Sequence, residues 1–122
     1  MDSTMTMFER YQGLVGIEQL VREFYRDVLA EPELAVYFKG HSVESIIQHQ
    51  IDLFCHIMGG PCSFEMERLE SAHRPLKIPE AHFDWVTRIL VENLEDAGFR
   101  QQDIDELAGI VMSVKPVVVH TP

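Results

Sequence analysis

The stretch Ile17-Glu-Gln-Leu-Val-Arg-Glu-Phe-Tyr-Arg-Asp-Val-Leu29 gives the clearest indication of how this 122-residue chain folds. Its apolar residues recur at intervals of three and four, which is the spacing of one face of an α-helix. Charged side chains such as Glu18 and Arg22 occupy positions between them. We therefore predict an amphipathic helix with one buried face. Pro32 is expected to limit it, because the residue before a proline avoids the α conformation.

The same periodicity continues on both sides of this stretch, and no segment alternates polar and apolar residues as a half-buried strand does. We predict an all-α chain that forms a single domain over residues 1–122. Residues 1–7 are expected to be disordered or to form a short helix, and no conformation is predicted for the tail 117–122. The further helical segments are expected over residues 34–38, from Ser42 to Gly59-Gly60-Pro61, over 69–76, from Pro79 to Gly98, and from about Asp103 to Pro116.

The composition excludes several classes of partner. A net charge of -10 opposes binding to nucleic-acid phosphates and to anionic lipid surfaces. No apolar run approaches the roughly 20 residues of a membrane span, and the N-terminus lacks the features of a signal peptide. We therefore expect a cytoplasmic protein. Its two cysteines, Cys55 and Cys62, are expected to be free thiols, with a bridge between them as the alternative.

Three polar residues interrupt apolar stripes on three different predicted helices: Tyr25, Gln50 and His73. Each taken alone is typical of a polar side chain that finds a partner in or beside the core. Together they favour a haem pocket, in which histidine supplies the axial nitrogen and other donors hydrogen-bond the bound gas. Glu70-Ser-Ala-His73 also matches the Glu-x-x-His pair of di-iron bundles, but that design needs a second such pair, which the sequence lacks.

No other chemistry has a matching pattern. The cysteines are not spaced as a C-x2-C zinc pair, and there is no G-x-S-x-G turn for a nucleophilic serine. Gly59-Gly60-Pro61 closes a helix, whereas a phosphate-binding glycine loop opens one.

The order of these residues resembles the group I truncated haemoglobins over roughly residues 8 to 115. The resemblance implies a two-over-two helical fold around haem b, in which His73 is the proximal iron ligand. It also implies that Tyr25 and Gln50 line the distal side and that Phe38 packs on the porphyrin. The matching stretches are Phe24-Tyr25, Val28-Leu29-Ala30, Pro32-Glu33-Leu34, Phe38 before Gly40, His49-Gln50, Gly59-Gly60-Pro61, Ala72-His73, Ile78 and His82-Phe83.

Some positions leave their role open. His49 lies on the flank of its helix, where solvent exposure is the ordinary expectation. In some cyanobacterial relatives a matching histidine binds iron as the sixth ligand, and we hypothesise that His49 does so. His120 is assigned no role, because it lies four residues beyond the histidine that those relatives attach to haem. Further expected haem contacts are Ile46, Leu53, Phe54, Ile78, Phe83 and Val86, with Arg68, Arg74 and Lys77 either meeting the propionates or solvated.

The resemblance implies reversible binding of O2, NO and CO, and it extends to oxidation of nitric oxide to nitrate. The second activity requires an external reductase, because the sequence has no flavin or nicotinamide motif. A gas sensor and a bis-histidine redox protein are the alternatives, so whether the chain is an enzyme stays open. A monomer or weak dimer is expected. The chain departs from the family at Gln12-Gly13, where paired glycines are usual, and at Phe64 and Met66, which replace a tyrosine and a glycine.

Overall fold

The computed structural model describes residues 5–119, with the side chains of Met66, Arg68, Glu70, Ala72 and Pro75 left outside the description. All regular elements within this range are helices, apart from one isolated β-bridge. The all-α prediction is therefore confirmed. The helices form two compact units, Met1–Phe64 and Glu65–Pro122.

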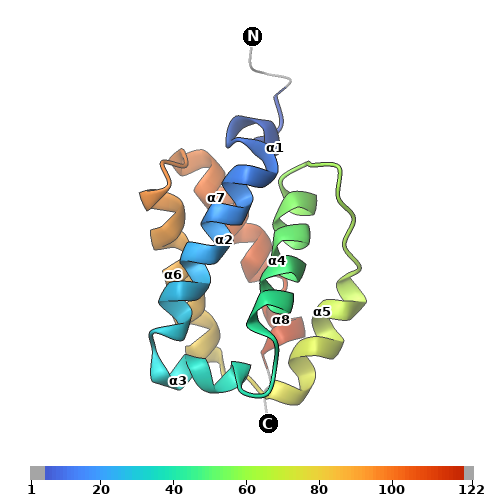
Figure 1. Ribbon diagram of the computed structural model, residues 1–122, viewed down its shortest axis with the longest axis vertical. Helices are drawn as coiled ribbons and strands as arrows, with labels where there is room; N and C mark the ends of the chain where they lie inside the picture. Colours follow the sequence, from blue (N-terminus) through green and yellow to red (C-terminus); the bar gives the residue numbers. More distant parts are fainter. Residues whose placement is uncertain (1–4, 120–122) are drawn as a thin grey trace. The chain divides into compact units, whose positions relative to one another are not determined.

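The first unit is built on two long helices that pack against each other, α2 (Gly13–Leu29) and α4 (Val43–Ile57) (Figure 1). The stripe predicted for α2 is buried, with Leu29 half-buried at its end. Ser42 caps α4 as expected, since its Oγ accepts a hydrogen bond of 3.2 Å from the Ser45 N–H. The shorter elements of this unit are α1 (Met7–Arg10), α3 (Pro32–Ala35) and the 3-10 turn η2 (Val36–Phe38).

The start of α2 has an unusual backbone. Gln12 and Gly13 both adopt positive φ angles, of 70° and 57°. This left-handed pair lets the chain turn from α1 into α2, and glycine is the residue that adopts it without strain. Gln12 therefore occupies a position that suits a glycine better. Gly16, one turn into α2, is equally constrained, because a Cβ there would lie 1.9 Å from the Tyr11 carbonyl oxygen.

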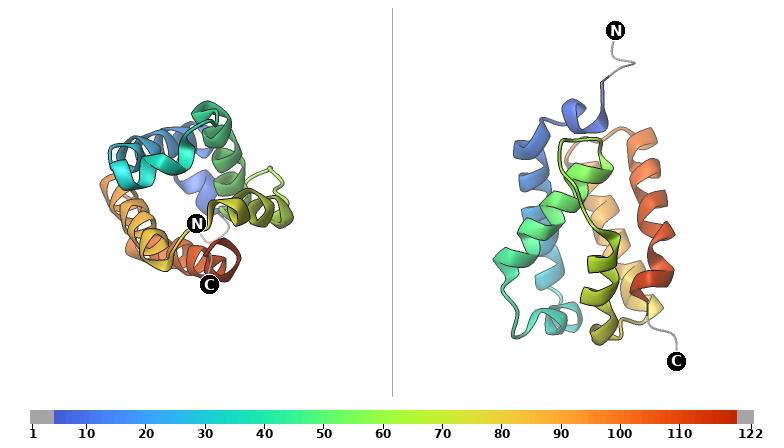
Figure 2. Two further views of the ribbon diagram at one scale, coloured as in Figure 1. Left: turned by 90° about the horizontal axis from the view of Figure 1, so that it is seen from below. Right: turned by 90° about the vertical axis from the view of Figure 1, so that its right-hand side faces the viewer.

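The second unit contains α5 (Met66–His73), the 3-10 turn η3 (Arg74–Leu76), α6 (Glu80–Asp96), α7 (Gln101–Ser113) and α8 (Lys115–Val118). Figure 2 shows α6 and α7 side by side, and they pack against each other. Two predicted helix starts are corrected: Pro79 precedes α6 as its N-cap, and α7 begins at Gln101. This helix ends at Ser113, before Pro116 as expected, and Pro116 lies in the first turn of the separate helix α8.

The last described residues are tied back to this unit. Val119 pairs with Ile78 in a parallel bridge, and Lys115 Nζ lies 2.8 Å from Glu80 and 2.9 Å from Asp84. The sequence predicted no conformation for residues 117–119. They are held in place by contacts with residues that are distant in the sequence. His120 lies outside the described residues.

The expectation that both cysteines are free thiols is wrong, because Cys55 and Cys62 form a disulfide with their Cα atoms 5.7 Å apart. The Gly59-Gly60-Pro61 turn is the physical reason. Gly60 donates a hydrogen bond of 2.8 Å to the Cys55 carbonyl, which folds the chain back along the last turn of α4. A cysteine count indicates whether a chain relies on a disulfide scaffold, but it does not report such local proximity.

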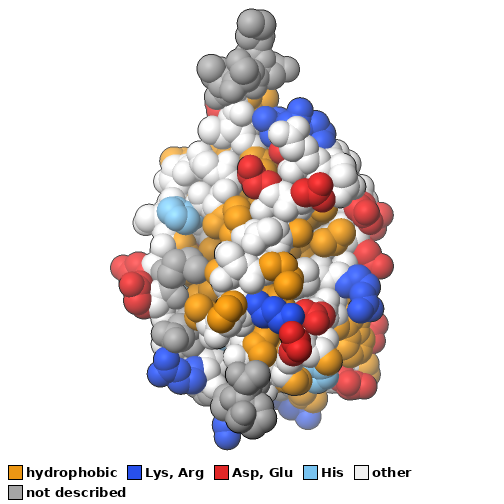
Figure 3. All heavy atoms as spheres, turned by 180° about the vertical axis from the view of Figure 1, so that it is seen from behind, with side chains coloured by type: hydrophobic (Ala, Val, Ile, Leu, Met, Phe, Trp, Pro, Cys, Tyr) orange, Lys and Arg blue, Asp and Glu red, His pale blue; other side chains and the backbone are white. Residues whose placement is uncertain are grey.

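The surface matches the composition. Figure 3 shows acidic, basic and hydrophobic side chains interspersed on the face that it presents. Within the described range, no helix combines the length and the hydrophobicity that crossing a membrane requires.

Candidate functional site

Tyr25 lies in the interior of the first unit, with 7% of its surface exposed. Its ring meets the rings of two other aromatic residues edge to face, Phe24 at a centroid distance of 5.0 Å and Phe38 at 5.7 Å. Burial raises the pKa of the Tyr25 hydroxyl above its ordinary value. The group is therefore a neutral O–H at physiological pH, able to donate one hydrogen bond.

The adjacent residues His49 and Gln50 differ in exposure. Gln50 is half-buried on the same side of α4 as the buried residues Ile47 and Phe54, whereas His49 is exposed. The difference follows from the helix geometry, because successive side chains are separated by about 100° around the axis. The inward orientation predicted for Gln50 is consistent with this position, and His49 lies on the flank that the periodicity indicated.

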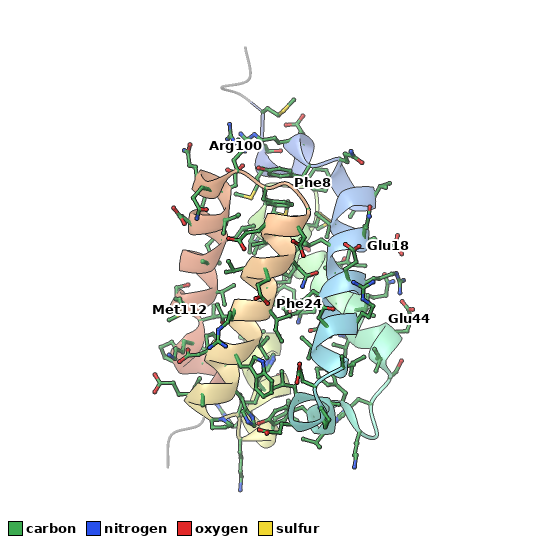
Figure 4. The ribbon with its side chains drawn as sticks, turned by 90° about the vertical axis from the view of Figure 1, so that its left-hand side faces the viewer. Phe8, Glu18, Phe24, Glu44, Arg100 and Met112 are labelled. Carbon is green, nitrogen blue, oxygen red and sulfur yellow. A yellow bond between two sulfur atoms is a disulfide. The ribbon has the colours of Figure 1, made fainter. Side chains whose placement is uncertain are left out.

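An ion-pair cluster that the sequence analysis missed joins the two long helices of the first unit. Arg22 on α2 holds Glu44 at the start of α4 with two hydrogen bonds, of 2.9 and 3.1 Å, and also bonds Glu18 at 3.0 Å. Figure 4 shows Glu18 and Glu44 on the same side of these neighbouring helices. The Arg22 hydrogen bonds lower the pKa of Glu44. Only the i, i+4 spacing of Glu18 and Arg22 was a sequence signal for this cluster.

In the second unit, His73 is the last residue of α5 and is half-buried. Its Nδ1 donates a hydrogen bond of 2.7 Å to the carbonyl oxygen of Leu69, one turn earlier in the same helix. In the neutral imidazole, a proton on Nδ1 leaves the lone pair on Nε2. Histidine ligands of metals are commonly oriented by such a bond from the other ring nitrogen.

The remaining predicted haem contacts divide between the two units. In the first, Phe54 is buried, and Phe38, Ile46 and Leu53 are half-buried. In the second, Phe83 is buried, and Ile78 and Val86 are half-buried, while Arg74 and Lys77 are exposed and the Arg68 side chain lies outside the description. The ammonium group of Lys115 lies 5.8 Å from the centre of the Phe83 ring.

An all-helical chain with a half-buried histidine whose ring is oriented by a hydrogen bond, and a buried tyrosine, has the features expected of a globin. Residues 6–119 match the family described as Bacterial-like globin, and the chain belongs to that family. Membership implies a haem cofactor and the binding of diatomic gases such as O2.

The relatives found by sequence are consistent with this assignment. The group 1 truncated haemoglobin of Tetrahymena thermophila is 29% identical over 87% of this chain and 88% of its own length. The corresponding protein of Mycolicibacterium paratuberculosis is 26% identical, over 93% of this chain and 83% of its own.

Solved structures show the same fold. The 2/2 haemoglobin of Synechococcus, determined in the cyanomet state with covalently attached haem, aligns with a TM-score of 0.82 and 29% identity over 90% of this chain and 93% of its own. Truncated haemoglobin from Tetrahymena pyriformis, in its Fe(III) form, aligns with a TM-score of 0.85 and 23% identity over 96% of this chain and all of its own. The two-over-two globin fold predicted from the sequence is confirmed.

Proposed function

We propose that this globin binds haem b with His73 as the axial ligand from the protein and that it binds O2, NO and CO reversibly. The hydrogen bond from Nδ1 of His73 to the Leu69 carbonyl is the observation that carries the proposal. It fixes the ring and its tautomer, so that Nε2 presents a lone pair of the kind that iron binds. The residue types on each unit fit haem, since aromatic and aliphatic side chains suit the porphyrin and a neutral imidazole suits the iron.

On the opposite side of the haem we assign Tyr25 and Gln50 as hydrogen-bond donors to the gas. When bound, haem supplies the iron at which O2, NO or CO is held. The Tyr25 hydroxyl suits a donor role because burial keeps it protonated and the rings of Phe24 and Phe38 restrict its movement. Gln50 suits it because its amide offers two N–H groups from a half-buried position.

We further propose that the protein oxidises nitric oxide to nitrate. The balance of this reaction is NO plus O2 plus one electron, giving nitrate, and the electron must come from an external reductase. Hydrogen-bond donors such as Tyr25 and Gln50 would slow the release of O2 and so favour its reaction with NO. We expect Tyr25→Phe to release O2 faster by about 10-fold, since a lost hydrogen bond of about 1.4 kcal/mol corresponds to that factor. Stopped-flow measurement of O2 release and of nitrate formed per NO tests both steps.

Coordination of the haem iron by His49, as a sixth ligand, is a separate proposal. His49 is exposed in this structure, so coordination requires its side chain to turn inward. Ferric protein with a low-spin spectrum that becomes high-spin in His49→Leu supports that role. A high-spin spectrum in the unsubstituted protein rejects it and leaves Gln50 and Tyr25 as the distal pair.

The test of the whole proposal is reconstitution of the apoprotein with haemin. We expect a Soret band in the unsubstituted protein, loss of tight binding in His73→Gly, and its recovery when imidazole is added. His82→Ala is the matched control, because His82 is a half-buried histidine on the neighbouring helix α6 that contacts Trp85 instead. Equal binding by His73→Gly without imidazole contradicts the assignment of the ligand.

A further inference from the structure

The disulfide occupies a special position in the chain. Cys55 belongs to the last turns of α4, and Cys62 lies two residues before Phe64, the end of the first unit. The bond therefore ends where the connection to α5 begins. Since α4 carries Gln50 and α5 carries His73, this connection joins the two helices to which we assign opposite sides of the haem.

Two groups of contacts hold the turn at the end of α4: backbone hydrogen bonds that do not require the disulfide, and the contacts of Cys62, which include it. The Met58 carbonyl accepts a 2.8 Å hydrogen bond from the Phe8 N–H, and Gly60 donates one of 2.8 Å to the Cys55 carbonyl. These bonds hold the chain as far as Gly60 without the disulfide. Beyond Gly60, Cys62 is held by the disulfide and by a 3.2 Å hydrogen bond from Nδ1 of the exposed His56 to its carbonyl.

Breaking the disulfide therefore lengthens the free connection without unwinding α4. With the bond intact, residues 63–65 link the fixed Cys62 to the start of α5 at Met66. Without it, the His56 hydrogen bond is exposed to competing water and holds Cys62 weakly, so that residues 61–65 link Gly60 to Met66. Two additional residues extend the reach of the chain by about 7 Å, at ~3.5 Å each.

The two sulfur positions also differ in access. Cys55 is fully buried, while Cys62 is half-buried. An attacking thiolate reaches Cys62 more readily, and it forms a mixed disulfide there as the Cys55 sulfur leaves and takes up a proton. The second thiol of a dithiol then displaces Cys62, so that the protein gains two electrons and two protons and the dithiol becomes a disulfide.

We infer that Cys55–Cys62 is a thiol–disulfide exchange site, reduced by protein dithiols, that sets how firmly the chain retains its haem. The inference rests on the proposed function, because it requires haem contacts on both α4 and α5. The oxidised form keeps the connection short and holds haem longer. Reduction speeds haem loss by about twofold, since the free connection grows from residues 63–65 to residues 61–65 and effective concentration falls as roughly the −3/2 power of tether length.

The experiment measures haem transfer to excess apomyoglobin from oxidised protein and from protein reduced by a dithiol, with alkylation and mass measurement reporting the thiol state. Cys62→Ser should lose haem at the reduced rate under both conditions. Ser63→Ala, an exposed loop variant that retains both cysteines, should respond to the dithiol as the unsubstituted chain does. Chymotrypsin cleavage after Phe64 in the apoprotein gives a readout without haem, and it should be faster in the reduced form.

The outcomes separate the two proposals. Equal rates of haem transfer in verified oxidised and reduced protein overturn the exchange-site inference and leave the proposed function intact. Two alkylatable cysteines in fully air-oxidised protein overturn it as well. A chain that takes up no haem in either thiol state contradicts the proposed function and, with it, this inference.

Discussion

The ring of Phe38 meets the ring of Tyr25 edge to face, with centroids 5.7 Å apart and planes at 87°. The contact joins the 3-10 turn after α3 to the long helix α2 and fixes the only hydrogen-bonding group of the Tyr25 side chain. Because Phe38 is itself only half-buried, it holds Tyr25 from the periphery of the unit. Phe38, which the resemblance places against the porphyrin, thus also positions Tyr25, to which we assign the hydrogen bond to the bound gas.

Replacing Phe38 tests this relationship. Phe38→Leu removes the edge-to-face contact and should lower the free energy of unfolding by about 1 kcal/mol. It should also speed O2 release, because the Tyr25 hydroxyl loses its fixed position. Denaturant unfolding and stopped-flow release measure the two effects. Val36→Ala, an exposed change in the same turn, should alter neither, and unchanged O2 release in Phe38→Leu contradicts the positioning role.

Gly16 gives a prediction in which local and tertiary effects oppose each other. Helix propensity alone favours Gly→Ala within a helix by about 1 kcal/mol. At Gly16, however, the new Cβ would lie 1.9 Å from the Tyr11 carbonyl oxygen, so that the backbone must shift. We expect Gly16→Ala to destabilise the protein by about 2 kcal/mol or more.

Gly109, which lies within α7, is the matched control for Gly16. A Cβ at Gly109 would have no neighbouring atom within 4 Å. Gly109→Ala should raise the free energy of unfolding by about 0.5–1 kcal/mol. Denaturant midpoints of the two variants, compared at constant m-value, provide the measurement. A stabilised Gly16→Ala would show that the α1–α2 turn adjusts without cost.

The positive φ of Gln12 leads to a stabilising substitution. A φ of 70° strains a residue with a Cβ, whereas glycine adopts it freely. Gln12→Gly should therefore stabilise the protein by about 1 kcal/mol, after allowance for the greater entropy of glycine in the unfolded chain. Gln12→Ala retains the strain and should leave the thermal midpoint nearly unchanged. Equal midpoints in both variants would contradict this explanation.

The pairing of Arg22 with Glu44 predicts a pH dependence. The Arg22 hydrogen bonds hold the pKa of Glu44 below its ordinary value in the folded protein. The pair therefore stabilises the fold above the pKa of an unfolded glutamate, and this contribution is lost as the pH falls through the lower folded value. Arg22→Gln should make the pKa of Glu44, measured by NMR, return toward normal. A value that stays low in Arg22→Gln would assign the shift to Gln48, the other hydrogen-bond donor to that carboxylate.

The sequence predicted the features that local chemistry determines. The stripe of α2, the end of α2 before Pro32 and the Ser42 cap each depend on residues within one or two turns, and the structure confirms them. Tyr25, Gln50 and His73 stood out for a similar reason, since each is a polar residue within an apolar periodicity. Their roles toward haem stay predictions.

The features that the sequence did not predict depend on pairs of distant residues or on an unusual local turn. Arg22 with Glu44, and Lys115 with Glu80 and Asp84, are ordinary surface charges until the helices that carry them pack together. The Cys55–Cys62 bond required knowledge of how the chain reverses at Gly60. Neither periodicity nor composition contains that information.

The parallel pairing of Ile78 with Val119 bears on the order of events during synthesis. Ile78 follows the helix that carries His73, but its partner leaves the ribosome only after α6, α7 and α8. Pairs so distant in sequence close late, because the intervening chain must first be ordered. A nascent chain therefore completes this pairing beside its proposed iron ligand only after Val119 has been synthesised, and firm capture of the cofactor is expected to follow the emergence of α8.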